Sequence, residues 1–254
     1  MQAIPIRSKL PNTGTTIFSV MSALAAKHQA INLSQGFPNF DPPAELRALV
    51  NEHLEASHNQ YAPMPGLAEL RHVLARKHEA SSGKLIDFQT EINITAGATQ
   101  AIFTAITCLV HPGDEVILFE PAYDSYRPAA ELSGAKVVSY SLRAPNFKVD
   151  WDAFEALITD RTRLIVINTP HNPTGMIWQK EDWQKLESLI ADRPIYVLSD
   201  EVYEQLVYDD EKHYSLLDFP ELYKRGFATY SFGKTFHATG WKTGYCIGPP
   251  DLMA

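Results

Sequence analysis

The spacing of hydrophobic residues along the chain changes character near residue 91. Before that point, hydrophobic residues recur at helical intervals, and turn-rich loops with proline and glycine separate the helical stretches. The helices expected in this part are 17–28, 44–56 and 66–80. A polar arm over residues 1–15 precedes them, and a turn-rich loop over residues 32–43 follows the first helix. The N-terminal part is therefore predicted to be helical, without strands.

After residue 91, short hydrophobic runs alternate with amphipathic helices. The expected strands are 92–95, 115–119, 135–140, 163–168, 195–199, 228–231 and 244–248, and the expected helices are 98–110, 123–133, 151–158 and 180–191. Runs that are hydrophobic throughout are typical of strands covered on both faces. The alternation predicts an α/β fold, a mostly parallel sheet with helices on both faces. We predict two regions, an N-terminal arm and helix over 1–43 and a large domain over 44–254.

Composition is ordinary for a globular protein, with 45% hydrophobic and 20% charged residues in a chain of 254. The net charge is −8, from 22 basic and 30 acidic residues, and no basic block stands out. This balance argues against nucleic-acid binding. An anionic ligand would need positive groups placed locally, since the overall field does not attract it.

The ends and cysteines of the chain give no sign of export or of a metal. The N-terminus has no apolar signal-peptide core, and no apolar run has the length that spans a bilayer. Cys108 and Cys246 are far apart in apolar stretches, and the histidines form no ligand spacing. We therefore predict a cytoplasmic protein that binds neither membrane nor metal.

Polar residues follow four of the expected strands, where a core sequence would be hydrophobic. They lie in the segments 95–100, 168–175, 199–203 and 231–242. Sites in open α/β sheets form outside the carboxyl ends of the strands. These four segments are therefore the candidates for chemistry.

Lys234 is the most informative residue among them. It follows the apolar run 227–230 and is bracketed by small residues. A partly desolvated lysine loses its proton readily and becomes a nucleophilic amine. Ser231 and Lys242 on either side have the chemistry to complete a phosphate site. Taken alone, the segment is explained equally well by a surface lysine on a loop.

Two further segments add an acid and two hydrogen-bonding groups. Asp200 follows four apolar residues, which predicts a buried carboxylate in need of a cationic partner; the alternative is a helix N-cap. Tyr203 reaches the same place if the chain turns helically after Asp200. Asn172 lies between two prolines that aim it at the strand ends, and its amide suits a phenolate or a carboxylate. Ordinary turn chemistry is the alternative for Asn172.

The small-residue turn Gly97-Ala98-Thr99 opens the helix expected over 98–110. Free N–H groups and the helix dipole make such a turn a cup for phosphate, although a plain tight turn has the same composition. It is neither the GxGxxG fingerprint of a dehydrogenase nor a Walker loop. A dinucleotide or ATP site therefore has no specific support.

The four segments, in this order, resemble the class I/II aminotransferases of fold type I, which use pyridoxal 5′-phosphate. The similarity is closest to bacterial methionine aminotransferase and the kynurenine–oxoglutarate aminotransferase group, and it runs from Leu33 to Tyr245. The resemblance implies that Lys234 forms the internal aldimine with the cofactor and that Asp200 pairs with its pyridinium nitrogen. It implies that Tyr203 and Asn172 bind the phenolic oxygen of the cofactor.

The remaining implied contacts come from both ends of the chain. Tyr123 matches the aromatic that stacks on the cofactor ring, although a core aromatic is the alternative. The implied phosphate cradle consists of Gly97, Ala98, Thr99, Ser231 and Lys242. Many relatives have arginine in place of Lys242. Tyr61 resembles the tyrosine that reaches the phosphate of the neighbouring subunit in a homodimer, with a surface tyrosine as the alternative. For the substrate, the resemblance points to Gly36 and Asn172, with Phe18 lining the side-chain pocket.

The implied reaction is transamination between an L-amino acid, of methionine or aromatic/kynurenine type, and a 2-oxo acid. It would proceed by ping-pong kinetics through the Lys234 aldimine. A cysteine-S-conjugate β-lyase or an aminocyclopropane-carboxylate synthase would share these residues. A non-catalytic regulatory module is a further alternative, but this sequence has no DNA-binding arm. A dehydrogenase is another, but this sequence has no glycine fingerprint.

The family places its substrate-carboxylate arginine in a C-terminal small domain, and this chain ends before such a domain. We therefore predict a truncated chain, whose own activity the sequence leaves open.

Overall fold

The structure, a computed structural model, describes residues 7–11, 13–36 and 39–254 and divides into two units. The first unit, residues 1–41, contains helix α1 (Ile17–Lys27). Thr16 caps this helix, because its side-chain oxygen accepts a hydrogen bond from the Ser19 N–H. No residue of α1 is buried within the unit.

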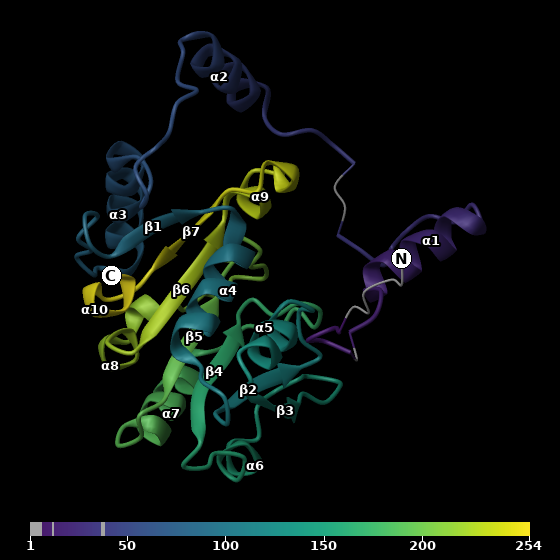
Figure 1. Cartoon of the computed structure of the whole chain (residues 1–254), viewed down its shortest axis with the longest axis vertical. Helices are drawn as coiled ribbons and strands as arrows, with labels where there is room; N and C mark the ends of the chain where they lie inside the picture. The colour runs from purple at the N-terminus through teal and green to yellow at the C-terminus, as the bar shows by residue number, and fades with distance from the viewer. Residues whose placement is uncertain (1–6, 12, 37–38) are drawn as a thin grey trace, which may run out of the picture. The chain divides into compact units, whose positions relative to one another are not determined.

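The second unit, residues 42–254, contains the sheet. Its described residues form one seven-stranded sheet in the order β1-β7-β6-β5-β4-β2-β3 (Figure 1). The strands are β1 (Ile92–Thr95), β2 (Glu115–Glu120), β3 (Lys136–Ser141), β4 (Thr162–Asn168), β5 (Tyr196–Asp200), β6 (Gly226–Ser231) and β7 (Gly244–Ile247). β7 pairs antiparallel with β1 and with β6, and the other pairs are parallel. The predicted fold class, a mostly parallel sheet with helices, is confirmed.

Helices precede the first strand, follow the last one and occupy the connections between the strands. The longer ones are α2 (Ala44–Glu55), α3 (Ala68–Ser82), α4 (Gly97–Leu109), α5 (Tyr126–Leu132) and α7 (Lys180–Ile190). The shorter ones are α6 (Trp151–Glu155), η1 (Leu216–Asp218), α8 (Pro220–Tyr223), α9 (Phe232–Thr235), η2 (Thr239–Trp241) and α10 (Pro250–Met253). Most bounds match the predicted ranges within about two residues, the usual scatter of helix ends. α5 begins three residues later than predicted and α6 ends three residues earlier. The short helices η1, α8, α9, η2 and α10 were not predicted.

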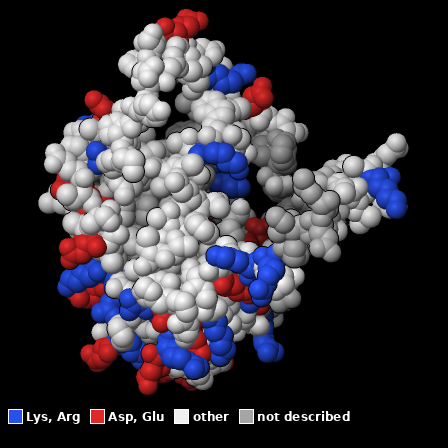
Figure 2. Space-filling view, viewed as in Figure 1, with Lys and Arg blue, Asp and Glu red and all other residues white. Residues whose placement is uncertain are grey.

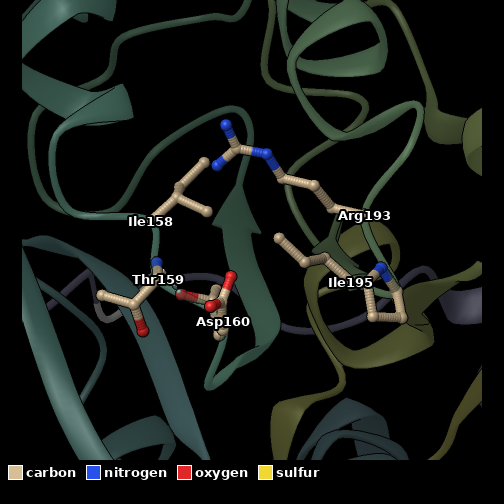
Figure 3. A pocket seen from close by; sticks show the side chains of 7 residues that line it. Ile158, Thr159, Asp160, Arg193 and Ile195 are labelled. Carbon is tan, nitrogen blue, oxygen red and sulfur yellow. Dashed lines mark hydrogen bonds between the residues drawn. The ribbon is translucent and has the colours of Figure 1, made fainter.

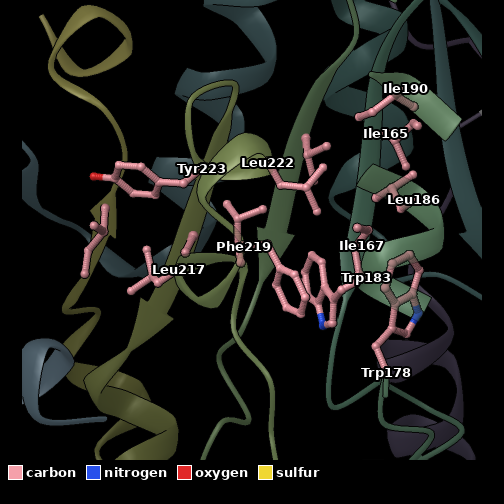
Figure 4. Close-up of a cluster of buried hydrophobic side chains, with 14 of the residues drawn as sticks. Ile165, Ile167, Trp178, Trp183, Leu186, Ile190, Leu217, Phe219, Leu222 and Tyr223 are labelled. Carbon is pink, nitrogen blue, oxygen red and sulfur yellow. The ribbon is translucent and has the colours of Figure 1, made fainter. Parts of the chain in front are cut away.

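The strands separate two hydrophobic clusters, one on each face of the sheet. Along β4, Ile165 and Ile167 pack in the cluster that contains Trp178 and Trp183 (Figure 4). Leu164 and its alternate neighbours on β4 and β2 pack in the other cluster, together with α4 and α5. Successive side chains of a strand point to opposite faces, so a strand covered on both sides is hydrophobic throughout. This explains why the central runs show no polar alternation.

Charged side chains of both signs lie on the face of the molecule that Figure 2 shows. Figure 2 shows acidic and basic side chains interspersed on the lower part of this face. In the described part of the chain, no helix has the length and apolar character to cross a membrane. Both cysteines are free, Cys108 on the surface and Cys246 buried in β7.

Candidate functional site

The carboxyl ends of three neighbouring strands meet at one edge of the sheet. Asn168 at the end of β4 pairs in register with Asp200 at the end of β5, and β6 beside them ends at Ser231. β7 is antiparallel, so its first residue, Gly244, lies at the same edge and pairs with Thr95 at the end of β1. The four polar segments predicted from the sequence all leave the sheet here. We call this the carboxyl edge.

Asp200 is a buried carboxylate, only 3% exposed. Its Oδ2 accepts a hydrogen bond from the Tyr126 hydroxyl at 2.5 Å, and its Oδ1 accepts one from the Val202 N–H at 3.3 Å. Burial raises the pKa of Asp200 to about 6, while these two bonds and the charge of Lys234 lower it. The alternative of a helix N-cap is not observed, because residues 202–205 form turns and no helix follows. A charged group that is this deeply buried needs a cation at the edge.

Lys234 is the third residue of α9, the short helix that directly follows β6. Its Nζ is 5.3 Å from the centre of the Tyr203 ring, within the range of a cation–π contact. Burial lowers the pKa of the Lys234 ammonium, and the negative charge of Asp200 partly offsets that effect. The interpretation as a fully solvated loop lysine therefore does not describe it. Its surroundings favour a neutral amine more than water does.

Tyr203 and Asn172 lie together beside this pair. Burial raises the pKa of the Tyr203 phenol most, the Asp200 charge adds to it, and a hydrogen bond with Asn172 lowers it. The Asn172 N–H donates to Asn168 Oδ1 at 2.7 Å, and Asn168 Nδ2 donates to the Asp200 carbonyl at 2.9 Å. Asn168 thus ties the loop after β4 to the end of β5. The peptide bonds before Pro170 and Pro173, which the sequence left open, are both cis.

Tyr123 follows β2 and is half-buried. Burial raises the pKa of its phenol, and a hydrogen bond with Thr99 lowers it. Its ring centre is 5.7 Å from that of Tyr126, in an edge-to-face arrangement. Tyr123 packs against the cluster beneath α4 as a core aromatic would, while its hydroxyl contacts the helix turn expected to bind phosphate.

The start of α4 packs directly against the start of β7. Gly97 opens the helix with a left-handed φ of +76°, which favours glycine. A Cβ at Gly244 would lie 2.7 Å from the Ala98 nitrogen, so the close approach requires glycine there too. The backbone carbonyl of Lys242 lies beside Gly97, where a Cβ would come within 3.9 Å of it. The N–H groups of the first helical turn, which have no partner within the helix, therefore lie in one small region with Lys242 and the end of β6.

Three predicted residues are not placed at this edge. Tyr61 lies between α2 and α3 and is fully exposed. Phe18 on α1 and Gly36 belong to the N-terminal unit. Their roles toward a neighbouring subunit and a substrate stay predictions.

Sequence reasoning missed Tyr126 and did not assign a role to Glu201. The Glu201 carboxylate is fully buried, and it accepts hydrogen bonds from Ser199 Oγ at 2.8 Å and from the Tyr230 hydroxyl at 3.0 Å. His213 Nε2 lies 3.1 Å from the same carboxylate, and this contact raises the pKa of the imidazole against the effect of burial. The signal for Glu201 was available, because side chains of adjacent residues at a strand end point to opposite faces. Glu201 thus anchors the chain behind Asp200.

A cavity of about 300 Å³ lies at the opposite edge of the sheet. It is lined by Ile158, Thr159, Asp160, Thr162, Arg193, Pro194 and Ile195 (Figure 3). These residues precede β4 and β5 or begin β4, so they belong to the amino ends of the strands. None of the predicted site residues lines this cavity. This cavity therefore lies apart from the predicted site.

Comparisons with known proteins point to one family. The family model described as "Aminotransferase class I and II" matches residues 28–254. The chain is 52% identical to methionine aminotransferase of Escherichia coli strain K12, over 98% of this chain and 64% of that protein. It is 35% identical to human kynurenine–oxoglutarate transaminase 1, over 91% of this chain and 58% of that protein.

Solved structures give the same result. A crystal structure of YbdL from Escherichia coli, described as having a methionine aminotransferase function, superposes with a TM-score of 0.95 and 50% identity. The match covers 99% of this chain and 65% of that one. N-succinyldiaminopimelate aminotransferase from Mycobacterium tuberculosis superposes with a TM-score of 0.93 and 39% identity, covering 98% and 65%. The chain thus spans about two-thirds or less of the length of these relatives.

Proposed function

Because the chain belongs to the class I and II aminotransferase family, we propose that its carboxyl edge binds pyridoxal 5′-phosphate and carries out transamination. The amino donor is an L-amino acid of the methionine or aromatic/kynurenine type, and the acceptor is a 2-oxo acid. Similarity to the Escherichia coli methionine aminotransferase supports methionine as the first donor to test. Because the chain spans about 64% of that relative, the activity of the whole protein is part of this proposal.

One observation carries the proposal more than any other. The buried carboxylate of Asp200 and the partly desolvated amine of Lys234 lie at the ends of adjacent parallel strands. The buried acid needs a cation, and its hydrogen bonds from the Tyr126 hydroxyl and the Val202 N–H come from neutral donors. The protonated ring nitrogen of pyridoxal phosphate is such a cation, and the start of α4 is a fitting site for its phosphate. The residues present therefore fit this cofactor.

When bound, pyridoxal phosphate supplies an aldehyde that bonds amines and a ring that accepts electrons from the substrate Cα. Asp200 stabilises the positive charge on the ring nitrogen. The Lys234 amine removes the proton from the substrate Cα and returns a proton later, as general base and acid. Tyr203 and Asn172 would hold the phenolic oxygen of the cofactor, and Tyr123 would pack against its ring. Lys242, Ser231 and the first turn of α4 hold the phosphate.

Each half of the reaction can be tested separately. The full chain, mixed with cofactor and L-methionine alone, is expected to release one equivalent of 2-oxo acid per site and then stop. Adding a second 2-oxo acid should restart product formation, as ping-pong kinetics requires. Release of pyruvate and ammonia from a cysteine conjugate would instead assign the β-lyase reaction. Absence of product with methionine, aromatic and kynurenine donors would contradict the proposed transamination.

The proposal includes a homodimer in which Tyr61 reaches the phosphate of the neighbouring subunit. Tyr61 and Met64 are both almost fully exposed, and Leu67 nearby is about half exposed. An exposed apolar stretch of this kind is typical of a surface that a partner covers. Sedimentation of the full chain should show a dimer. The Tyr61→Phe variant should bind the cofactor more weakly and should remain a dimer. A monomer that binds cofactor with the same affinity as its Tyr61→Phe variant would contradict this part.

A further inference from the structure

We propose that Tyr126 is a positioning residue of the carboxyl edge, whose hydroxyl holds the Asp200 carboxylate in place and in its ionised form. The inference rests on the proposed function for the use of that carboxylate, though the bond itself does not. Tyr126 lies at the first residue of α5, separated from Asp200 by 74 positions in the sequence. It would act through Asp200 and needs no contact with cofactor or substrate.

The geometry of this contact is that of a strong hydrogen bond. The two oxygens are 2.5 Å apart, and each residue is 3% exposed, so water does not compete for either group. Burial and the neighbouring Asp200 charge raise the pKa of the Tyr126 phenol well above its ordinary value. The phenol therefore keeps its proton, and the direction of the bond is fixed. Tyrosine donates and the carboxylate accepts.

The other groups around Asp200 do not replace this bond. The Val202 N–H contacts the second carboxylate oxygen at the longer distance of 3.3 Å. Glu201, the next residue, raises the pKa of Asp200 by charge repulsion, and the Lys234 charge lowers it least among the causes. Tyr123 and Tyr203 also face Asp200, but each is a neutral phenol whose own pKa the carboxylate raises. Of the influences that lower the pKa of Asp200, the Tyr126 hydroxyl is the largest.

The ionised form of Asp200 is the form that can stabilise a cation. With a pKa of about 6, Asp200 is mostly ionised at neutral pH. Removing a hydrogen bond to a buried charged group is expected to raise its pKa by about one or more. About half of the Asp200 side chains would then be neutral at pH 7, and a neutral acid does not balance the charge of a protonated ring nitrogen.

The same sheet offers a matched control. Tyr223 is also 3% exposed and donates to a buried carboxylate, Glu91, at 2.8 Å. Tyr223 precedes β6 and Glu91 precedes β1, so this pair lies at the edge of the sheet opposite Asp200. Tyr126→Phe and Tyr223→Phe thus each remove one buried phenol–carboxylate bond while keeping the ring. A merely structural role for Tyr126 predicts the same consequences for both.

The first measurement uses the full chain without cofactor. Carboxyl carbon NMR, with the Asp200 signal assigned by its loss in Asp200→Asn, should show its pKa raised by about one in Tyr126→Phe. The Tyr223→Phe variant should leave it unchanged. An Asp200 pKa that is the same in wild type and Tyr126→Phe would overturn the proposal, whatever the enzyme does.

The second measurement uses the enzyme loaded with cofactor. In Tyr126→Phe, the acidic limb of the turnover–pH profile should move up by about one pH unit, and turnover should recover at higher pH. Tyr223→Phe should keep the wild-type limb. A limb that stays in place in Tyr126→Phe contradicts the proposal. An NMR shift in a chain that shows no transamination would instead support the bond and reject the proposed function.

A further substitution guards against loss of folding in Tyr126→Phe. Site-specific incorporation of 3-fluorotyrosine in place of Tyr126 keeps the shape and makes the hydroxyl a stronger donor. The pKa of Asp200 should then fall below its wild-type value. A pKa that rises or does not move would overturn the proposal even if the phenylalanine variant is unstable.

Discussion

Glu115 and Asp200 are both buried carboxylates, but they lie at opposite edges of the same sheet and have opposite surroundings. Glu115, at the start of β2, accepts hydrogen bonds from Thr159 Oγ1 at 2.7 Å and Arg161 at 2.9 Å. The Thr159 bond and the cations lower the pKa of Glu115, whereas burial raises that of Asp200 to about 6. One acid is fully compensated within the fold. Asp200 accepts hydrogen bonds from neutral donors and can still bind a cation. This difference is what we expect between a functional carboxylate and a structural one.

The two edges also differ in shape. The amino edge contains the cavity of about 300 Å³, with Asp160 and Arg193 in its lining. The carboxyl edge contains Asp200 and Lys234, whose pKa values are both shifted toward the neutral form, together with the close glycine contacts and the start of α4. Chemistry follows the strand ends, as the topology of a parallel sheet requires. A hollow without convergent reactive groups does not make a site.

The largest effect is expected from Lys234. Lys234→Ala should lower the rate of the methionine half-reaction at least about 10³-fold, because it removes the general base. Lys224→Ala, a surface lysine paired with Glu221 at 2.6 Å, is the matched control and should keep wild-type activity. Product release is measured after rapid mixing. A Lys234→Ala variant with normal rates would assign the chemistry to another residue.

Substitution of Asp200 should affect activity, whereas substitution of Glu115 should affect stability. Asp200→Asn should reduce turnover about 10²-fold or more while leaving the free energy of unfolding unchanged or higher. Glu115→Gln should keep turnover per folded molecule and cost about 1–3 kcal/mol of unfolding free energy, because charged hydrogen bonds are lost. Both quantities are measured on the same preparations. Equal behaviour of the two variants would remove the distinction between the edges.

The contributions of Asp200 and Glu115 to stability should change with pH in opposite directions. Asp200 has a pKa raised from 3.8 to about 6, so its contribution is fully present below the lower value and is lost as pH rises through 6. The loss is roughly 3 kcal/mol at most. Glu115 has a lowered pKa, so its contribution is present above its ordinary value of 4.5 and is lost as pH falls through its folded pKa. Above pH 6, the free energy of unfolding of Asp200→Asn should therefore rise relative to that of wild type. In acid, the free energy of unfolding of Glu115→Gln should approach that of wild type.

Denaturant unfolding between pH 4 and 8 measures both contributions. If the stability difference between Asp200→Asn and wild type does not change across pH 4–7, the pKa of Asp200 is not raised in the folded protein.

The smallest effect concerns two lysines. Lys242→Ala should weaken cofactor binding by about tenfold, since one charged contact to phosphate is lost. Lys136→Ala, which removes a partly exposed ion pair with Glu115 at 3.1 Å, should leave cofactor affinity unchanged. Equilibrium titration with pyridoxal phosphate gives both values. Equal affinities for the two variants would place the phosphate elsewhere.

Local pattern was enough to predict the strands, because each central run is hydrophobic throughout. It also marked Asp200, a charge directly after such a run, and Lys234, a charge a few residues after another. The start of α5 was predicted too early, because residues 122–125 form loop and turn despite a helical composition. Boundaries depend on such local hydrogen bonds, which periodicity does not encode.

The contacts that tune the site could not be predicted in the same way. Tyr126 and Asp200 are joined across 74 positions, and nothing in the sequence near either residue marks the other. His213 reaches Glu201 from an irregular loop with no periodic pattern. These pairings are decided by how the elements pack, and only coordinates show them.

The most direct test of the account is to locate the cofactor on the chain. The full chain is mixed with stoichiometric pyridoxal phosphate, reduced with borohydride and mapped by peptide mass spectrometry. We expect the label on the peptide that contains Lys234, and its loss in Lys234→Ala. Label spread over exposed lysines, or a labelled peptide that remains in Lys234→Ala, would contradict the assignment of the carboxyl edge as the cofactor site.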